Sequence, residues 1–206
     1  MNQATNHPAL LVELLTEELP PHALTRLADS FAQGIRTRLA ARQLLASEDA
    51  TADIYATPRR LAVRLPGVRA QADAREIQIK GPSVAVGLDA EGQPTKALIK
   101  WAEKQGAEVS ALTRGHDGKQ EVFYWSSTQP GAVLADVIGE IIVETLAQLP
   151  IPKFMTYQLA DGLTTVSFVR PAHRLVVLHG DAVLPCTVLG LAADRITDGH
   201  RFLSSG

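Results

Sequence analysis

The stretch VELLTEELPPHAL (residues 12–24) joins an apolar run to a double proline, and it decides how the surrounding chain is interpreted. Residues 10–15 have the length and composition of a buried strand. Pro20 and Pro21 interrupt this run, and proline is favoured in the first turn of a helix. The stretch therefore predicts a strand that turns directly into a helix.

The predicted helix continues to about Leu45. Its large apolar residues recur three or four positions apart, which is the period of a helix with one apolar face. These residues are Leu24, Leu27, Phe31, Ile35 and Leu39. The pattern predicts an amphipathic helix of about five or six turns.

The rest of the chain mixes short β signals with two further helices. Strands are predicted at residues 52–56, 60–65, 75–80, 121–126, 166–169, 175–179 and 183–189, and helices at residues 95–105 and 132–149. His179-Gly180-Asp181 suits a hairpin turn between the last two strands. We expect an α+β fold with a largely antiparallel sheet, two long amphipathic helices and one shorter helix. A polar stretch predicts a possible internal boundary near residues 82–94.

Bulk composition limits the class of protein. The chain has 206 residues, of which 46% are hydrophobic and 20% charged, and a net charge of −2. These values are typical of a globular protein and show no global basic field. Cys186 is the only cysteine, so no disulfide framework or cysteine-based zinc site is expected. No apolar run reaches the roughly 20 residues that span a bilayer, so we expect no membrane association and a cytoplasmic location.

The glutamates of the opening stretch allow two interpretations. Glu13, Glu17 and Glu18 could bind a metal or exchange protons, and Glu13 and Glu17 together with His22 would suit a free-standing hydrolase. Alternatively, they end a strand and place negative charge at a helix start, where the helix dipole favours it. The structural interpretation explains most of the pattern. No phosphate loop, nucleophile elbow or metal-ligand spacing accompanies these residues, so we expect no catalytic residue, metal site or cofactor site.

Basic side chains gather beside predicted turns and on one predicted helix. The planar guanidinium of arginine binds two phosphate oxygens at once, which makes such clusters candidates for phosphate contact. The alternatives are a solvated face, pairing with acids inside the fold, or a scaffold that binds acidic proteins. The candidates are Arg59, Arg60, Lys100, Arg170, His173, Arg174 and Arg201. Lys100 forms a row with Lys96 and Lys104 on the predicted helix, beside Trp101.

Six stretches in this order resemble one known family. They are VELLTEELPPHAL, ATPRRLAV, IQIKGP followed by KALIKWAEKQG, LPIPKFM, VSFVRPAHRLVVLHGD and LGLAADRITDGHRFL. Together they resemble the β subunit of the bacterial heterotetrameric glycyl-tRNA synthetase. The resemblance covers most of residues 1–206 but only the N-terminal part of the family's longer subunit. We therefore expect a fragment of a longer chain, consistent with the abrupt end at Gly206.

The resemblance implies a division of labour. In that family the α subunit handles glycine, ATP with Mg²⁺, and aminoacyl transfer, whereas the β subunit handles tRNA(Gly) and assembly into an α2β2 heterotetramer. The candidate basic residues then become candidate tRNA contacts, in a segment that is itself non-catalytic. The family's β subunit also has a region similar to an editing domain of phenylalanyl-tRNA synthetase, and this segment is a candidate for part of it.

The chain departs from the family pattern at a few positions. Leu14-Leu15 stands where the family tends to have Ile-Gly, which removes a permissive backbone position. Asp198 stands where the family often has arginine. The second change weakens the case for phosphate binding by the final loop.

Overall fold

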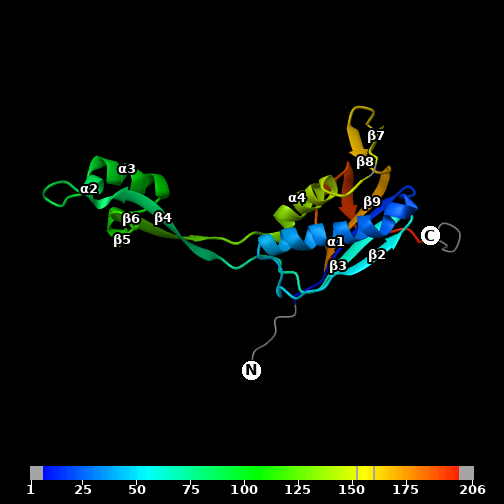
Figure 1. Cartoon of the computed structure of the whole chain (residues 1–206), viewed down its shortest axis with the longest axis horizontal. Coiled ribbons are helices and arrows are strands. Elements are labelled where there is room, and N and C mark those ends of the chain that lie inside the picture. Colours follow the sequence, from blue (N-terminus) through cyan, green and yellow to red (C-terminus); the bar gives the residue numbers. More distant parts are fainter. Residues whose placement is uncertain (1–6, 152, 160, 200–206) are drawn as a thin grey trace, which may run out of the picture. The chain divides into compact units, whose positions relative to one another are not determined.

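A computed structural model describes residues 7–151, 153–159 and 161–199 (Figure 1). The chain divides into two units, the first formed by Met1–Asp73 with Gly131–Gly206 and the second by Ala74–Pro130. The second unit is thus inserted between two halves of the first. The expected internal boundary near residues 82–94 lies inside the second unit.

The first unit is built on a seven-stranded sheet in the order β11-β12-β9-β1-β3-β2, with β10 also pairing with β9. All pairings are antiparallel except that of β12 with β9. The strands are β1 (Leu10–Thr16), β2 (Asp53–Thr57), β3 (Arg60–Leu65), β9 (Ala172–His179), β10 (Ala182–Val183), β11 (Thr187–Val188) and β12 (Leu191–Asp194). A separate hairpin pairs β7 (Met155–Gln158) with β8 (Thr165–Phe168).

Strand β1 lies between β3 and β9 and supplies the centre of the core. Leu10, Val12 and Leu14 are fully buried, and they share a face with the residues paired to them on both neighbours. Helices α1 (Leu24–Ala41) and α4 (Leu134–Ala147) pack on the same hydrophobic core. The two helices lie alongside each other in Figure 1. Alternation along β1 therefore sets one face against the helices.

Helix α1 begins where the double proline predicts and ends earlier than expected. A short 3-10 turn (Pro21–Ala23) precedes it. Gln43 adopts a left-handed backbone conformation with φ of 59°, and the amide of Leu44 donates to the carbonyl of Leu39. A left-handed residue of this kind closes a helix and satisfies its last carbonyls. The expected continuation to Leu45 is therefore wrong, because the chain turns out of the helix after Ala41.

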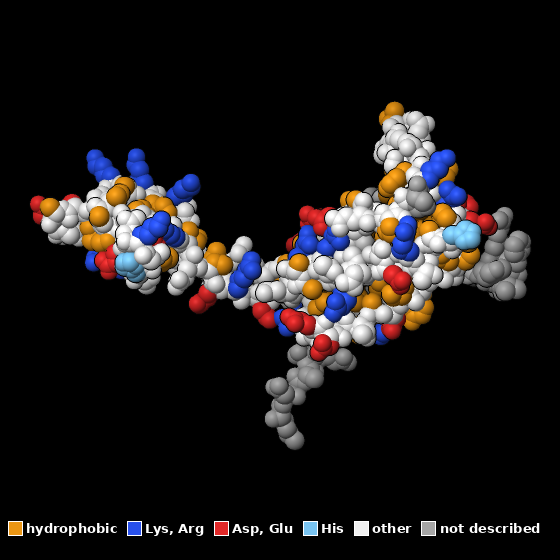
Figure 2. All heavy atoms as spheres, in the orientation of Figure 1, with side chains coloured by type: hydrophobic (Ala, Val, Ile, Leu, Met, Phe, Trp, Pro, Cys, Tyr) orange, Lys and Arg blue, Asp and Glu red, His pale blue; other side chains and the backbone are white. Residues whose placement is uncertain are grey.

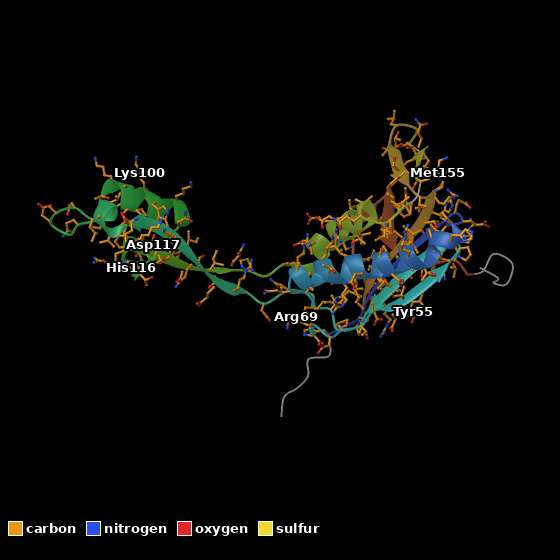
Figure 3. All side chains as sticks on the ribbon, viewed as in Figure 1. Tyr55, Arg69, Lys100, His116, Asp117 and Met155 are labelled. Carbon is orange, nitrogen blue, oxygen red and sulfur yellow. The ribbon has the colours of Figure 1, made fainter. Side chains whose placement is uncertain are left out.

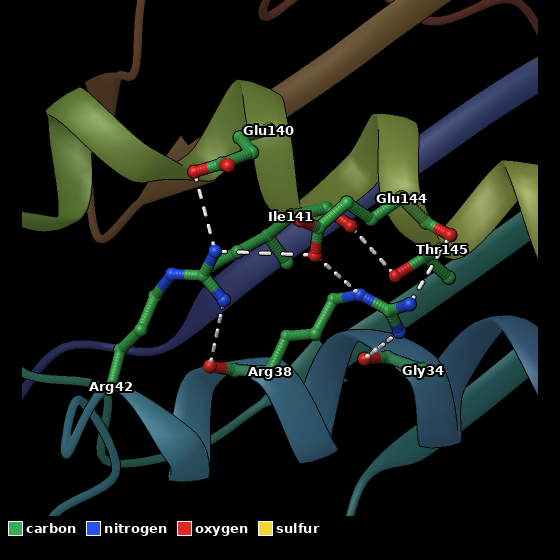
Figure 4. A network of polar contacts seen from close by, with 7 residues as sticks. All are labelled: Gly34, Arg38, Arg42, Glu140, Ile141, Glu144 and Thr145. Carbon is green, nitrogen blue, oxygen red and sulfur yellow. Dashed lines mark hydrogen bonds and ion pairs between the residues drawn. The ribbon is translucent and has the colours of Figure 1, made fainter.

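A polar network joins α1 to α4 (Figure 4). Arg38 Nε lies 2.9 Å from Glu144 Oε2, and the guanidinium also donates to the carbonyls of Glu144 and Gly34. Directly after α1, Nη2 of the C-cap residue Arg42 lies 3.2 Å from Glu140 Oε2. The helices approach closely here because Gly34 has no side chain: a Cβ at this position would lie 2.6 Å from Cγ2 of Thr145.

The second unit is a three-stranded antiparallel sheet in the order β4-β6-β5 with two helices. Its elements are β4 (Arg75–Ser83), α2 (Val84–Gly87), α3 (Lys96–Gln105), a 3-10 turn (Val109–Ala111), β5 (Thr113–His116) and β6 (Glu121–Gln129). Thr95 caps α3 by accepting from the amide of Leu98, and Gly106 ends it with φ of 69°. Both ends of α3 are thus where the sequence predicts them.

Several short strands differ from expectation. β5, β7 and β12 were not predicted. The strand predicted at residues 183–189 is wrong, because β10 and β11 are separated by Leu184, Pro185 and Cys186. Proline has no amide hydrogen to donate to a neighbouring strand, so the run cannot pair continuously. The predicted turn at Gly180, which has φ of 59°, is confirmed between β9 and β10.

Candidate functional site: a glutamate–arginine cluster

The glutamates and arginines that the sequence singled out lie together at one end of β1. Backbone hydrogen bonds join three separate segments there. The amide of Thr16 donates to the carbonyl of Arg59 at 3.0 Å, that of Glu17 to Pro171 at 2.8 Å, and that of Leu19 to Pro58 at 2.6 Å. These bonds place the turn after β1 between the β2–β3 turn and the start of β9.

Glu13 forms the buried part of this cluster. It lies on the face of β1 opposite Val12 and Leu14, as its alternation predicts. However, it is only 8% exposed, and the hydroxyl of Thr197 donates to its carboxylate. Arg60 Nε lies 3.3 Å from Glu13 Oε1, an ion pair without hydrogen-bond geometry. Glu13 is therefore a buried carboxylate neutralised inside the fold.

Glu17 forms the exposed part of the cluster. Its carboxylate lies 3.0 Å from Nη2 of Arg59 and 2.8 Å from Nε2 of His173. Arg59 also donates from Nε to the carbonyl of Thr16 at 3.4 Å. All three charged side chains are more than a third exposed. Ion pairs this exposed contribute about 0–1 kcal/mol, so their main effect is to orient the side chains.

The remaining arginines also contact groups within the unit. Arg170 donates from Nε to the carbonyl of Glu18 at 2.9 Å. Arg174 Nε lies 2.7 Å from Oδ2 of Asp198. Asp198, whose presence departs from the family pattern, thus neutralises a neighbouring arginine. These contacts fasten residues 195–199 and the start of β9 to the cluster.

The predicted site residues separate into three groups. Arg59, Arg60, Arg170, His173 and Arg174 come together in the cluster. Lys100 lies on α3 in the second unit (Figure 3), and Arg201 lies outside the described residues. Contact of these residues with tRNA stays a prediction. Sequence reasoning had raised Arg–Glu pairing without identifying partners, and it missed Thr197. The strand register, in which Leu15 lies opposite both Arg60 and Arg174, brings these arginines to the end of β1, whereas Thr197 lies outside the strands and gives no such signal.

The cluster does not have the arrangement of a hydrolytic centre. Glu13 and Glu17 are engaged by arginines, and His22 is exposed on the 3-10 turn before α1. Within residues 7–151, 153–159 and 161–199, no group of three or more histidine, cysteine or acidic residues could hold a metal ion.

Burial raises the pKa of the Cys186 thiol, which lowers the thiolate fraction and its nucleophilicity. Across the same part of the chain, no helix is long and apolar enough to cross a membrane.

Comparison with known proteins agrees with the six-segment resemblance. A family model described as glycyl-tRNA synthetase beta subunit matches residues 10–206. The chain belongs to this family. The glycine–tRNA ligase beta subunit of Leptothrix cholodnii is 50% identical over 96% of the chain, and that of Delftia acidovorans is 51% identical over 96%. The subunit of Nitrosomonas eutropha is 46% identical over 94%.

The match covers only part of these relatives. The chain spans 28% of the Leptothrix subunit, 29% of the Delftia subunit and 27% of the Nitrosomonas subunit. Family membership therefore applies to the chain described here.

Proposed function

We propose that this chain is the N-terminal segment of a glycine–tRNA ligase β subunit. In this proposal it supports tRNA(Gly) binding and assembly with a catalytic α subunit in a cytoplasmic α2β2 enzyme. The single observation that carries the proposal is the family match over residues 10–206. ATP and Mg²⁺ act through the α subunit to activate glycine, and this segment contributes no catalytic group.

The glutamate–arginine cluster fits a positioning role within such a subunit. Its arginines are matched in number by the acids Glu13, Glu17, Glu18 and Asp198, so it presents no large excess of positive charge. Arg59 and Arg174 are nonetheless 38% and 42% exposed. A guanidinium has several N–H donors, and an ion pair with one carboxylate does not occupy all of them. The glutamates hold the arginines in place, and the remaining donors can contact phosphates.

A pair of double variants tests this role in the full-length β subunit assembled with its α subunit. Arg59→Ala/Arg60→Ala removes the cations, whereas Glu13→Gln/Glu17→Gln removes the same ion pairs and keeps the cations. We expect only the arginine variant to raise the KM for tRNA and to weaken its salt dependence, because phosphate contact needs the cation. ATP-dependent glycine activation without tRNA should not change in either variant.

The alternative is that the arginines serve only the fold. In that case the KM for tRNA and its salt dependence change in neither double variant, measured in the protein that stays folded. Lost thermal stability alone does not decide the question, because Arg60→Ala removes the partner of the buried Glu13 in either case. An unchanged KM would limit the cluster to an internal brace. The assignment of the chain to a tRNA-charging subunit would still stand, because it depends on the family match.

A further inference from the structure

Helix α3 of the second unit presents a row of lysines to solvent. Lys96, Lys100 and Lys104 are spaced four residues apart, and all three are exposed. At about 1.5 Å per residue, successive lysines lie about 6 Å apart along the helix axis. The buried residues of α3, Leu98 and Ala102, are on its opposite side. We name Lys96, Lys100 and Lys104 the lysine stripe.

The lysine stripe differs from the arginine cluster in its charge balance. No ion pair or hydrogen bond of its side chains occurs among the residues that the structure describes. Glu103 flanks the stripe on the same helix, and it is exposed and makes no ion pair with it. Basic side chains project from the helical part of the second unit in Figure 2. In this unit Lys80 is neutralised by Asp117, whereas the stripe keeps its charge.

The backbone beneath the stripe is held firmly. Thr95 caps the first turn of α3, and Gly106 closes the last turn. Trp101 packs over β4, where a Cβ on Gly81 would lie 2.9 Å from its ring. The indole is therefore used to attach α3 to the sheet and is only partly exposed. The helix offers regularly spaced cations without an exposed aromatic platform for base stacking.

We propose that the lysine stripe binds the phosphodiester backbone of an RNA. The identification of this RNA as tRNA rests on the proposed function. A polyanion with regularly repeated charges can neutralise all three ammonium groups at once. Lysine is a mobile, strongly hydrated point charge, which suits phosphate contact without a fixed bidentate geometry. Contacts to phosphate carry no base information, so the stripe positions the RNA without reading its sequence.

Salt-dependent binding of the full-length β subunit to fluorescently labelled tRNA(Gly) tests the proposal. The test variant is Lys96→Gln/Lys100→Gln/Lys104→Gln. The charge-matched control is Arg75→Gln/Lys119→Gln/Lys153→Gln, which neutralises exposed cations outside the stripe. A third variant, with arginine at all three stripe positions, keeps the charge. Circular dichroism verifies that each variant is folded.

The stripe variant should bind more weakly. The magnitude of its slope of log K against log salt should fall by about 2–3, because each of the three lost phosphate contacts removes about 0.7–0.9. The arginine variant should match the wild type, and the control should keep its slope. An unchanged slope in the stripe variant, or an equal loss in the control, would overturn the proposal. So would normal tRNA binding with lost binding to the α subunit, because the stripe would then contact an acidic protein surface.

The same titration separates this inference from the proposed function. If the wild-type subunit binds tRNA and the stripe variant matches it, only the inference on α3 fails. If the wild-type subunit binds no tRNA, both fail.

Discussion

Gly34→Ala tests whether α1 and α4 approach as closely as the structure indicates. A Cβ at this position would lie 2.6 Å from Cγ2 and 3.2 Å from Oγ1 of Thr145. Thr145 is 1% exposed, and its hydroxyl donates to the carbonyl of Ile141 at 2.7 Å. Threonine populates two χ1 rotamers in a helix, but the buried Thr145 would have to give up its present packing or hydrogen bond to change rotamer. The helices must move apart, or the threonine must lose its hydrogen bond.

The expected effect is the difference between two opposing terms. Overpacking of a well-packed interface costs about 1–3 kcal/mol. Replacing glycine by alanine within a helix gains about 1 kcal/mol from propensity. Gly34→Ala should therefore reduce the free energy of unfolding by about 0–2 kcal/mol, combining these ranges. Thr145→Ser removes Cγ2 and keeps the hydroxyl, so adding it to Gly34→Ala should relieve the strain.

Urea unfolding of the wild type, both single variants and the double variant gives the coupling energy. Far-UV circular dichroism reports all helices, of which α1 and α4 in the first unit are the longest, whereas Trp101 and Trp125, the two tryptophans of the chain, report the second unit. We expect a favourable coupling of about 1–3 kcal/mol between the substitutions, within the range for residues in contact. Additive effects, or a Gly34→Ala variant more stable than the wild type, would refute the close approach of the helices.

Two further predictions concern charged pairs. Arg60→Ala should lower the melting temperature clearly more than Arg59→Ala, because it leaves the buried Glu13 without its cation. The loss should stay below the roughly 3–5 kcal/mol of a fully buried pair, since the Arg60 side chain is 27% exposed and Thr197 still donates to Glu13. Equal melting temperatures would contradict this. Hydrogen bonds from Lys80 and from two backbone amides hold the pKa of Asp117 well below its ordinary value. Its contribution to stability is therefore fully present above the unfolded pKa of about 3.9 and is lost as the pH falls through the folded value. The stability difference between the wild type and Asp117→Asn should shrink below about pH 4 in thermal melts, and a constant difference would contradict the pairing.

The main elements of the fold could be predicted because each has a local cause. Alternation identifies β3, the double proline starts the first helix, and Thr95 with Gly106 bounds α3. The short strands could not be predicted in this way. β5 and β12 are only four residues long, and each exists because a longer neighbour supplies its hydrogen bonds. Two-residue periodicity is too weak a signal over such lengths.

The cluster was predictable in its members but not in its contacts. Sequence reasoning singled out Glu13 and Glu17 and, separately, Arg59 and Arg60. Their pairing depends on the register of β3 against β1, which tertiary packing determines. Glu13 also accepts a hydrogen bond from Thr197, which is far away in the sequence. Charge and residue type therefore identified the candidates, and long-range topology decided which charges are neutralised.

The most direct test of the account is a glycylation assay with radiolabelled glycine, ATP and tRNA(Gly). Three samples are compared: this chain alone, the full-length β subunit alone, and the full-length β subunit assembled with the α subunit. The account predicts glycyl-tRNA only in the third sample, because the proposed function assigns glycine activation and transfer to the α subunit. Robust charging by the 206-residue chain alone would contradict it.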